Sequence, residues 1–185
     1  MSSKPLAVVT GASSGIGAAA AKHLAQAGYD LVLGARRLEK LQAVAEPLEA
    51  RAISLDVTDA ASVAAFCDLI PAVNVLVNNA GGALGLEPIA EADEEKWRTM
   101  FESNVLGTMR MTRTLLPKLE ASGQGHIVVI GSIAGFEVYP GGAGYTAAKH
   151  AERAVVETLR LELLGKPIRV TEIAPGLVET EFSLV

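Results

Sequence analysis

The feature that most constrains the fold of this chain is the alternation of short apolar runs with longer segments of helical periodicity. Each apolar run is followed by a segment in which apolar residues recur every three or four positions. This alternation is typical of βαβ units, in which a helix connects two parallel strands. It predicts an α/β fold with a doubly wound parallel sheet and helices on both of its faces.

The bounds of the runs give the expected elements of a Rossmann-like, three-layer α/β/α arrangement. Ligands of such sheets bind at the carboxyl ends of the strands, and the motifs described below follow strands or begin helices. We expect a loop at residues 81–92. The predicted strands are residues 6–10, 31–35, 52–56, 73–78, 126–131 and 168–173, and the predicted helices are 15–27, 38–46, 60–70, 94–119 and 144–164, with residues 57–59 leading into the third helix.

Composition and charge exclude several classes of protein. Half of the 185 residues are hydrophobic, which suits one globular domain. The formal net charge of -5 gives no electrostatic footprint for nucleic acid. No apolar run is long enough to span a membrane, and a single cysteine, Cys67, excludes an internal disulfide. We therefore expect a cytoplasmic protein, and the three histidines show no metal-ligand spacing.

A glycine-rich turn lies between the first predicted strand and the first predicted helix. Gly11, Gly15 and Gly17 follow the pattern G-x-x-x-G-x-G. Glycine permits a tight turn and a close approach of the backbone to a pyrophosphate, and the helix N-terminus adds N–H groups and a positive dipole end. An ordinary strand–helix turn has a similar composition. The position at the first βα turn favours a dinucleotide site, whose contacts would include Ser13, Ser14 and Ile16.

The end of the second strand indicates which dinucleotide is bound. An acid at this point usually bonds the ribose 2′-hydroxyl of NAD, but this chain has Arg36 and Arg37 instead. A guanidinium pairs with a phosphate in bidentate geometry, so Arg36 favours NADP(H), with Ser13 and Arg37 as further contacts. The alternative is two solvated arginines at the start of a helix.

Two further strand ends supply candidate cofactor contacts. Asp56 and Val57 would lie beside the adenine, with Asp56 accepting from its amine, although Asp56 also suits the start of a helix. Asn79, Ala80 and Gly81 follow the fourth strand, where short side chains allow close approach to a ribose or hold neighbouring strands together.

The candidate chemistry lies in Tyr145 and Lys149, four residues apart at the start of a predicted helix. That spacing places both side chains on one helix face. An ammonium beside a phenol stabilises the phenolate, and such a phenol can give a proton to a carbonyl or take one from an alcohol. A Tyr and a Lys at this spacing occur by chance in many helices. The pair becomes informative because it follows the glycine turn, Asn104 and Ser132 in that order along the chain.

Together these motifs resemble the short-chain dehydrogenase/reductase family over essentially the whole chain. Within the family, the stretches 83–88, 140–142 and 175–183 are most similar to bacterial NADP-dependent serine/3-hydroxy acid dehydrogenases. The resemblance implies that Tyr145 is the general acid or base, that Lys149 tunes it and bonds the nicotinamide ribose, and that Ser132 polarises the substrate oxygen. Asn104 would hold a water chain that leads to Lys149.

The resemblance also implies roles near the end of the chain. Pro175, Gly176 and Val178 would shape the nicotinamide pocket, and Thr180 would bond the carboxamide or cap a helix. Family members continue beyond Val185 with a segment over the substrate, a helix and a seventh strand. We therefore expect residues 1–185 to form one dinucleotide-binding and catalytic domain that lacks this C-terminal strand and helix.

Several functions stay open from sequence alone. No Arg or Lys in 81–87, 133–144 or 177–185 is available for a substrate carboxylate, and Leu84, Phe136, Val138 and Leu177 indicate an apolar pocket wall. This keeps a general aldehyde/ketone reductase as an alternative to a 3-hydroxy acid dehydrogenase. A non-catalytic NADP-sensing protein would not need the complete catalytic set, and Arg36 argues against a nucleotide-sugar epimerase. The family implies a homodimer or homotetramer formed through the helices that begin near Glu94 and Gly144.

Overall fold

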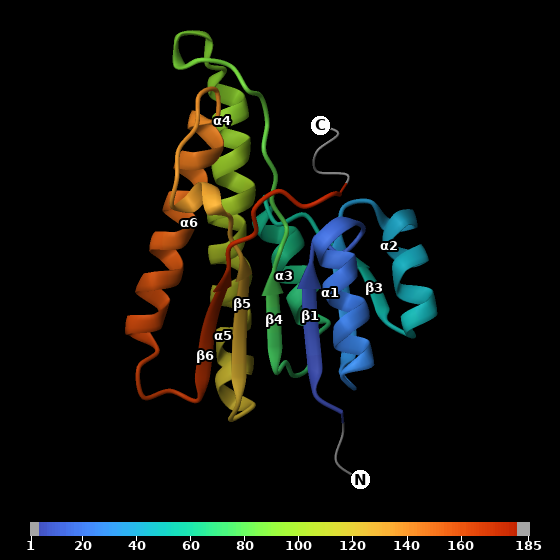
Figure 1. Ribbon diagram of the computed structural model, residues 1–185. Coiled ribbons are helices and arrows are strands. Elements are labelled where there is room, and N and C mark those ends of the chain that lie inside the picture. Colours follow the sequence, from blue (N-terminus) through green and yellow to red (C-terminus); the bar gives the residue numbers. More distant parts are fainter. Residues whose placement is uncertain (1–3, 181–185) are drawn as a thin grey trace.

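The computed structural model describes residues 4–180 as a six-stranded sheet flanked by helices on both faces (Figure 1). All neighbouring strands pair in parallel, in the order β3-β2-β1-β4-β5-β6. The predicted doubly wound α/β fold is therefore confirmed. The strands are β1 Leu6–Thr10, β2 Asp30–Ala35, β3 Arg51–Ser54, β4 Val75–Asn78, β5 Gly125–Ile130 and β6 Ile168–Ile173.

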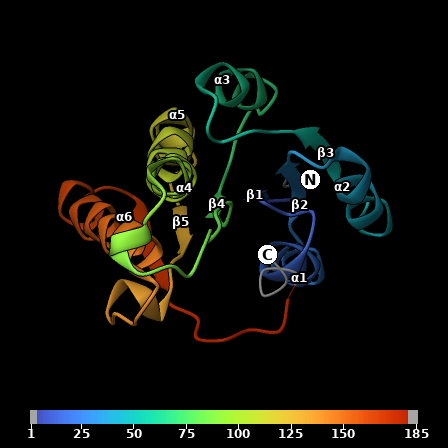
Figure 2. The ribbon, with the colours of Figure 1, turned by 90° about the horizontal axis from the view of Figure 1, so that it is seen from above.

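Two apolar cores hold the helices against the sheet. Helices α1 and α2 pack on one face, and α3, α5 and α6 pack on the other. The two faces can be followed from above in Figure 2. The strands carry Ala, Val, Leu and Ile because both of their faces are buried. The helices are α1 Gly15–Gln26, α2 Leu38–Ala45, α3 Ala60–Asp68, α4 Glu94–Phe101, α5 Gly107–Ala121 and α6 Ala143–Glu162.

The order of strands reverses between β1 and β4, because β1 pairs with β2 on one side and β4 on the other. In a doubly wound sheet, the crevice at such a reversal is the usual ligand site. The glycine turn follows β1, and the segment from Asn79 follows β4. The topology therefore brings these two motifs together at one edge of the sheet.

The structure corrects the predicted helix at 94–119. Two α-helices, α4 and α5, are joined by a π-helical segment, Glu102–Leu106. Pro117 lies inside α5, which continues to Ala121. Elsewhere the differences are a few residues: the third strand ends at Ser54 rather than residue 56, and α3 ends at Asp68 rather than residue 70. Residues 181–185, where the sequence predicts the segment that leads to the substrate, lie outside the described residues.

Candidate active site

The glycine turn is folded too tightly to admit a side chain at Gly11 or Gly17. Gly11 and Gly15 adopt left-handed φ values of 64° and 55°. A Cβ added to Gly17 would lie 2.6 Å from the carbonyl oxygen of Gly11 and 2.5 Å from Asn79 Nδ2. Ser14 is the N-cap of α1, and its side chain makes no capping bond. The first N–H groups of α1 therefore keep the orientation that suits a phosphate.

Thr10 and Asn79 tie the glycine turn to the end of β4. Thr10 Oγ1 accepts hydrogen bonds from the N–H groups of Asn79 and Ala80, each at 3.0 Å. Asn79 Nδ2 donates to the carbonyl oxygens of Thr10 at 2.9 Å and Gly11 at 3.2 Å. The sequence left Asn79 between a cofactor and a structural role, and its described contacts are structural. Thr10 was not identified, although a hydroxyl at the end of an apolar strand was a visible signal.

The two arginines after β2 point to different neighbours. Arg37 Nη2 donates to Ser14 Oγ at 2.7 Å and to Ser13 Oγ at 3.2 Å, so this guanidinium lies over the glycine turn. The charge of Arg36 acts instead on Asp56. The sequence favoured Arg36 as the main phosphate contact. The structure brings Arg37 to the loop that would carry the phosphates.

Asp56 and Val57 occupy local positions. Asp56 Oδ1 accepts from the Thr58 N–H at 2.9 Å and the Thr58 hydroxyl at 2.7 Å. Burial opposes ionisation of Asp56, but the bonds from Thr58 and the charge of Arg36 together lower its pKa. The N-cap of α3 is Asp59 rather than Asp56. Val57 is buried and packs in the core on the α3 face of the sheet.

The segment after β5 places Ser132 beside the predicted catalytic helix. Ser132 is the N-cap of a short 3₁₀ helix, Ile133–Gly135, and its Oγ accepts from the Ala134 N–H at 3.1 Å. A hydroxyl that accepts a bond still has its own proton to donate. A Cβ at Gly135 would lie 3.1 Å from the Lys149 carbonyl oxygen, so this segment rests directly on α6.

Tyr145 and Lys149 both lie in α6, as the sequence predicts. Lys149 is buried, and its Nζ lies 5.9 Å from the centre of the Tyr145 ring. That ammonium donates to the carbonyl oxygen of Ile130, the last residue of β5, at 3.0 Å. The contact joins the helix that carries Tyr145 to the strand that leads into Ser132.

Two neighbours of this pair were not found from the sequence. Glu152 Oε2 accepts from Lys149 Nζ at 2.6 Å. Tyr139, in the loop before α6, has its pKa raised by burial and by the nearby Tyr145 phenol. A second phenol therefore lies close to Tyr145. The Glu152 signal was visible as a glutamate among the inward-facing positions of α6.

Asn104 lies in the π-helical segment and is fully buried. Its Nδ2 donates to the carbonyl oxygens of Met100 at 2.8 Å and Gly82 at 2.9 Å. Its Oδ1 has no hydrogen-bond partner among the described residues and faces Gly81, where a side chain would overlap with it. Gly81 is thus required for Asn104 to fit, and π-helical segments occur frequently at functional sites.

The described residues after β6 run back toward the glycine turn (Figure 1). Pro175 accepts at its carbonyl oxygen from the Ile133 N–H at 3.0 Å. A Cβ at Gly15 would lie 3.3 Å from Thr180 Cβ. Gly176 and Val178 lie between these two contacts and are exposed. The segment therefore connects the Ser132 region to the start of α1.

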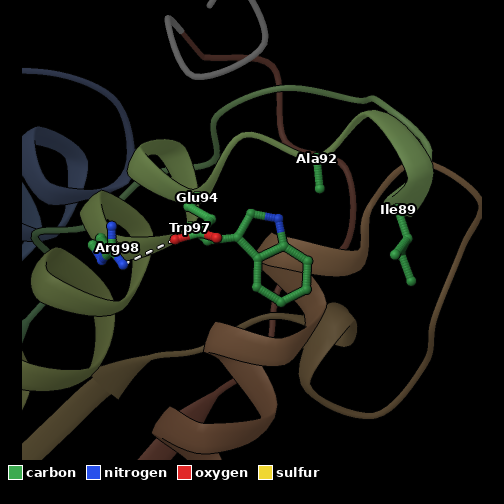
Figure 3. Close-up of a pocket in the computed structure, with 5 residues that line it drawn as sticks. All are labelled: Ile89, Ala92, Glu94, Trp97 and Arg98. Carbon is green, nitrogen blue, oxygen red and sulfur yellow. Dashed lines mark hydrogen bonds and ion pairs between the residues drawn. The ribbon is translucent and has the colours of Figure 1, made fainter.

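A shallow apolar hollow lies next to this site, at the start of α4 (Figure 3). It has a volume of about 350 Å³ and is lined by Ile89, Ala92, Glu94, Trp97 and Arg98. The Trp97 indole nitrogen would lie 2.9 Å from a Cβ at Gly144, the residue before Tyr145. The hollow is thus linked to the catalytic helix by one side chain.

Exposed apolar side chains surround the same region. Val138 and Leu177 are largely exposed and Phe136 is half exposed on the loops at this end of the sheet. The Arg153 guanidinium stacks on the Phe136 ring at 3.8 Å. Within residues 4–180, no helix is long and apolar enough to cross a membrane. The same residues include no cluster of three or more His, Cys, Asp or Glu side chains of the kind that holds a metal ion.

Comparison with known sequences shows the family. The model of the short chain dehydrogenase family matches residues 5–184. An uncharacterized oxidoreductase of Mycobacterium tuberculosis is 61% identical over 98% of this chain and 72% of the relative. Sulfoacetaldehyde reductase of Chromohalobacter salexigens is 45% identical over 96% of this chain and 74% of its own length. The NADP-dependent 3-hydroxy acid dehydrogenase of Salmonella typhimurium is 42% identical over 97% of this chain and 75% of its own length.

A solved structure supports the same family. The closed form of serine dehydrogenase complexed with NADP⁺ matches with a TM-score of 0.92 at 39% identity, over 96% of this chain and 75% of that one. The chain belongs to the short chain dehydrogenase family and is an oxidoreductase. The predicted family is confirmed, and so is the predicted resemblance to serine and 3-hydroxy acid dehydrogenases.

Proposed function

We propose that the protein is an NADP(H)-dependent oxidoreductase that interconverts a primary or secondary alcohol and its carbonyl compound by hydride transfer. The observation that carries this proposal is the buried Lys149 ammonium, which lies beside the Tyr145 ring and bonds the end of the strand that leads to Ser132. A proton donor and a hydroxyl for one substrate oxygen are thereby placed on adjacent elements. The nicotinamide supplies the hydride chemistry when bound.

The roles of the residues follow from their chemistry. Tyr145 donates a proton to the carbonyl oxygen in reduction and accepts it from the alcohol in oxidation. Lys149 stabilises the phenolate by its charge. The Ser132 hydroxyl donates to the substrate oxygen, while its own oxygen is held by Ala134. Asn104 Oδ1, which no residue of the described part of the chain bonds, is a fixed acceptor for a water that supplies protons.

The residues present fit a dinucleotide. The space that a Cβ would fill at Gly17 shows how closely the backbone turns there, and the α1 N-terminus is open to phosphate. Arg37 beside Ser13 and Ser14 groups a cation and two hydroxyls at the glycine turn, and this grouping supports binding of a 2′-phosphate there. The NADP-dependent 3-hydroxy acid dehydrogenase of Salmonella typhimurium and the serine dehydrogenase complexed with NADP⁺ support the same choice of cofactor.

We expect substitution of either arginine by aspartate to reduce the preference for NADP(H). Arg36→Asp and Arg37→Asp each remove a phosphate donor and add a repelling charge, so kcat/KM for NADPH should fall about tenfold or more relative to NADH. The larger effect is expected at Arg37, because that guanidinium contacts the glycine turn. Arg113→Asp on exposed α5 surface is the matched control. An unchanged cofactor ratio in both variants would refute the phosphate-binding role.

The substrate class is small and polar at one end. The names of the relatives give serine, 3-hydroxy acids and sulfoacetaldehyde as their substrates. In each of these compounds one carbon separates the acid group from the carbon that reacts. We propose a substrate of this class, with an aldehyde or ketone of more apolar character as the alternative. The exposed Phe136 and Val138 side chains favour the alternative.

Turnover with a substrate panel tests both candidates. The complete protein is assayed with NADP and NAD on serine, 3-hydroxyisobutyrate, malonic semialdehyde and sulfoacetaldehyde, and against apolar aldehydes and ketones. Turnover of the acids with NADP would support the hydroxy-acid class. Preference for apolar carbonyls would assign a general reductase. Tight NADPH binding without turnover on any member would support the non-catalytic, NADP-sensing alternative.

We further propose that residues 1–185 form one domain of a cytoplasmic homodimer or homotetramer. The small residues Ala147, Ala151, Ala154 and Val155 on α6 remain partly or fully accessible, and can contact a second copy. Ala148 is fully buried and packs within its own chain instead. Light scattering of the full protein tests this proposal, and a monomeric mass would contradict it.

A further inference from the structure

The inward face of α6 carries a carboxylate where an apolar residue is expected. Ala148, Glu152 and Val156 follow one another at four-residue spacing, and each is at most 2% exposed. Such a row packs against the sheet in an amphipathic helix. Glu152 therefore lies among core residues, and the reaction assigned above does not use it.

Both oxygens of Glu152 are bound. Oε1 accepts from the Thr108 hydroxyl of α5 at 2.9 Å, and Oε2 accepts from Lys149 Nζ at 2.6 Å. The Lys149 and Glu152 side chains are 7% and 3% exposed, so this is a buried ion pair. The pair links α5, α6 and, through the Ile130 carbonyl, the end of β5.

The contacts of Lys149 limit where its ammonium can lie. An ammonium has three N–H donors, and the described bonds to Glu152 and Ile130 use two of them. One donor is left for Tyr145 or a bound ribose. Glu152 and the strand end therefore hold the cation at one place, with the Tyr145 ring 5.9 Å away.

Stability alone gives little reason for this arrangement. Desolvating two charges costs as much as their attraction returns in many buried pairs, and apolar replacement is often neutral or stabilising. Ionisable groups with perturbed titration at a cleft are more frequent at functional sites. The pKa of Glu152 is raised by burial, against the opposing effects of Lys149 and Thr108.

Among residues 4–180, two charged groups act on Glu152. Lys149 on the same helix stabilises its anion, and Glu172 on β6 opposes it. From α5 the contact is the neutral Thr108 hydroxyl, and from β5 it is the Ile130 carbonyl that Lys149 shares. Tyr145, one helical turn before Lys149, is a further titratable neighbour of the ammonium, with its ring centre 5.9 Å from Lys149 Nζ.

We infer that Glu152 is a positioning residue of the catalytic site: its carboxylate, held by Thr108, fixes the Lys149 ammonium and balances its charge, and thereby sets the pH at which Tyr145 exchanges its proton. This inference rests on the proposed function for its consequence in catalysis. The geometry of the three side chains does not depend on that function.

Removing the charge of Glu152 has a defined sign. With glutamine at this position, the anion that opposes a nearby phenolate is gone, and the positive charge of Lys149 acts on Tyr145 uncompensated. The phenolate then forms at lower pH. A single nearby charge moves a titration by about 1 pH unit or more, so we expect a shift of that size in Glu152→Gln.

The direct measurement is a phenolate absorbance titration of the protein without cofactor. The chain has three tyrosines, so the Tyr145 signal is obtained by subtracting the titration of a Tyr145→Phe background, with and without Glu152→Gln. We expect the Tyr145 midpoint to move down by about 1 pH unit. The pH profile of NADP-linked oxidation should have its acidic limb moved in the same direction.

Three variants make the test specific. Glu157→Gln changes an exposed glutamate on the same helix, paired with Arg153, and should leave the midpoint in place. Glu152→Asp keeps the charge and should restore the midpoint toward that of the unchanged protein. Thr108→Val removes only the hydroxyl bond to Glu152 and should shift the midpoint in the same direction by a smaller amount; it decides the question if Glu152→Gln does not fold.

The outcomes separate this inference from the proposed function. If kcat falls at every pH and the titration midpoint is unmoved in both Glu152→Gln and Thr108→Val, Glu152 is only structural and the inference is overturned. If the midpoint moves but no carbonyl or alcohol is turned over by the unchanged protein, the positioning role stands and the proposed function fails.

Discussion

Tyr145→Phe is expected to lower kcat for carbonyl reduction by about 1,000-fold while leaving the affinity for NADPH within about twofold. The substitution removes one hydroxyl and keeps the ring that lies 5.9 Å from Lys149 Nζ, so the buried ammonium keeps its surroundings. General acid catalysis contributes about 10²- to 10⁴-fold, and no other described phenol lies in α6. Steady-state kinetics and NADPH fluorescence titration give the two quantities.

The nearby Tyr139 provides the matched control. It carries the same hydroxyl and lies close enough to Tyr145 for burial, together with that phenol, to raise the Tyr139 pKa. Tyr139→Phe should change kcat by less than about tenfold if Tyr145 alone transfers the proton. Turnover retained in Tyr145→Phe but lost in Tyr139→Phe would reverse the assignment.

The parts of the fold that the sequence predicts well are those where burial is nearly complete. The interior strands are apolar because helices cover both faces of the sheet. This pattern can be recognised in the sequence without knowing which helix packs on which strand. Val8 and Leu76 pair in neighbouring strands although they are far apart in the sequence. The parallel order follows from the alternation with helices, so the location of the site at the carboxyl ends was predictable.

The parts that were not predictable depend on side chains that meet only in three dimensions. The π-helical segment adds no sequence pattern of its own, yet it turns Asn104 toward Gly82. The direction of Arg36 and Arg37 depends on where β2 ends relative to the glycine turn. Adjacent arginines look equivalent in sequence, but only the contacts show that Arg37 reaches Ser14.

Glu152 shows another reason why a site residue is not identified from the sequence. The periodicity of α6 marks the position as buried, and a buried glutamate is a conflict between pattern and residue type. Such conflicts are expected at functional sites. The partner that resolves this one, Thr108, comes from another helix whose register was interrupted by the π segment. The conflict could therefore be seen in the sequence, but its resolution could not.

The glycine turn offers the second large effect, because an added side chain at Gly17 would meet the Gly11 backbone as well as the Asn79 side chain. Gly17→Ala is expected to lower kcat/KM for NADPH by about 100-fold, since displacement of a binding element by about 1 Å has effects of this size. The added Cβ would lie 2.6 Å from the Gly11 carbonyl oxygen, so the turn must open. Overpacking should also reduce the free energy of unfolding by about 1–3 kcal/mol.

Gly28→Ala separates the loss of cofactor binding from the loss of stability. Gly28 has a φ of 89°, so alanine there strains the backbone and destabilises the protein, but no atom lies within 4 Å of the added Cβ. Gly28 also lies before β2, at the opposite end of the sheet from the glycine turn. Urea unfolding should therefore show a loss in both variants, whereas the NADPH dissociation constant should rise only in Gly17→Ala. If both dissociation constants rise equally, general destabilisation rather than the shape of the turn limits cofactor binding.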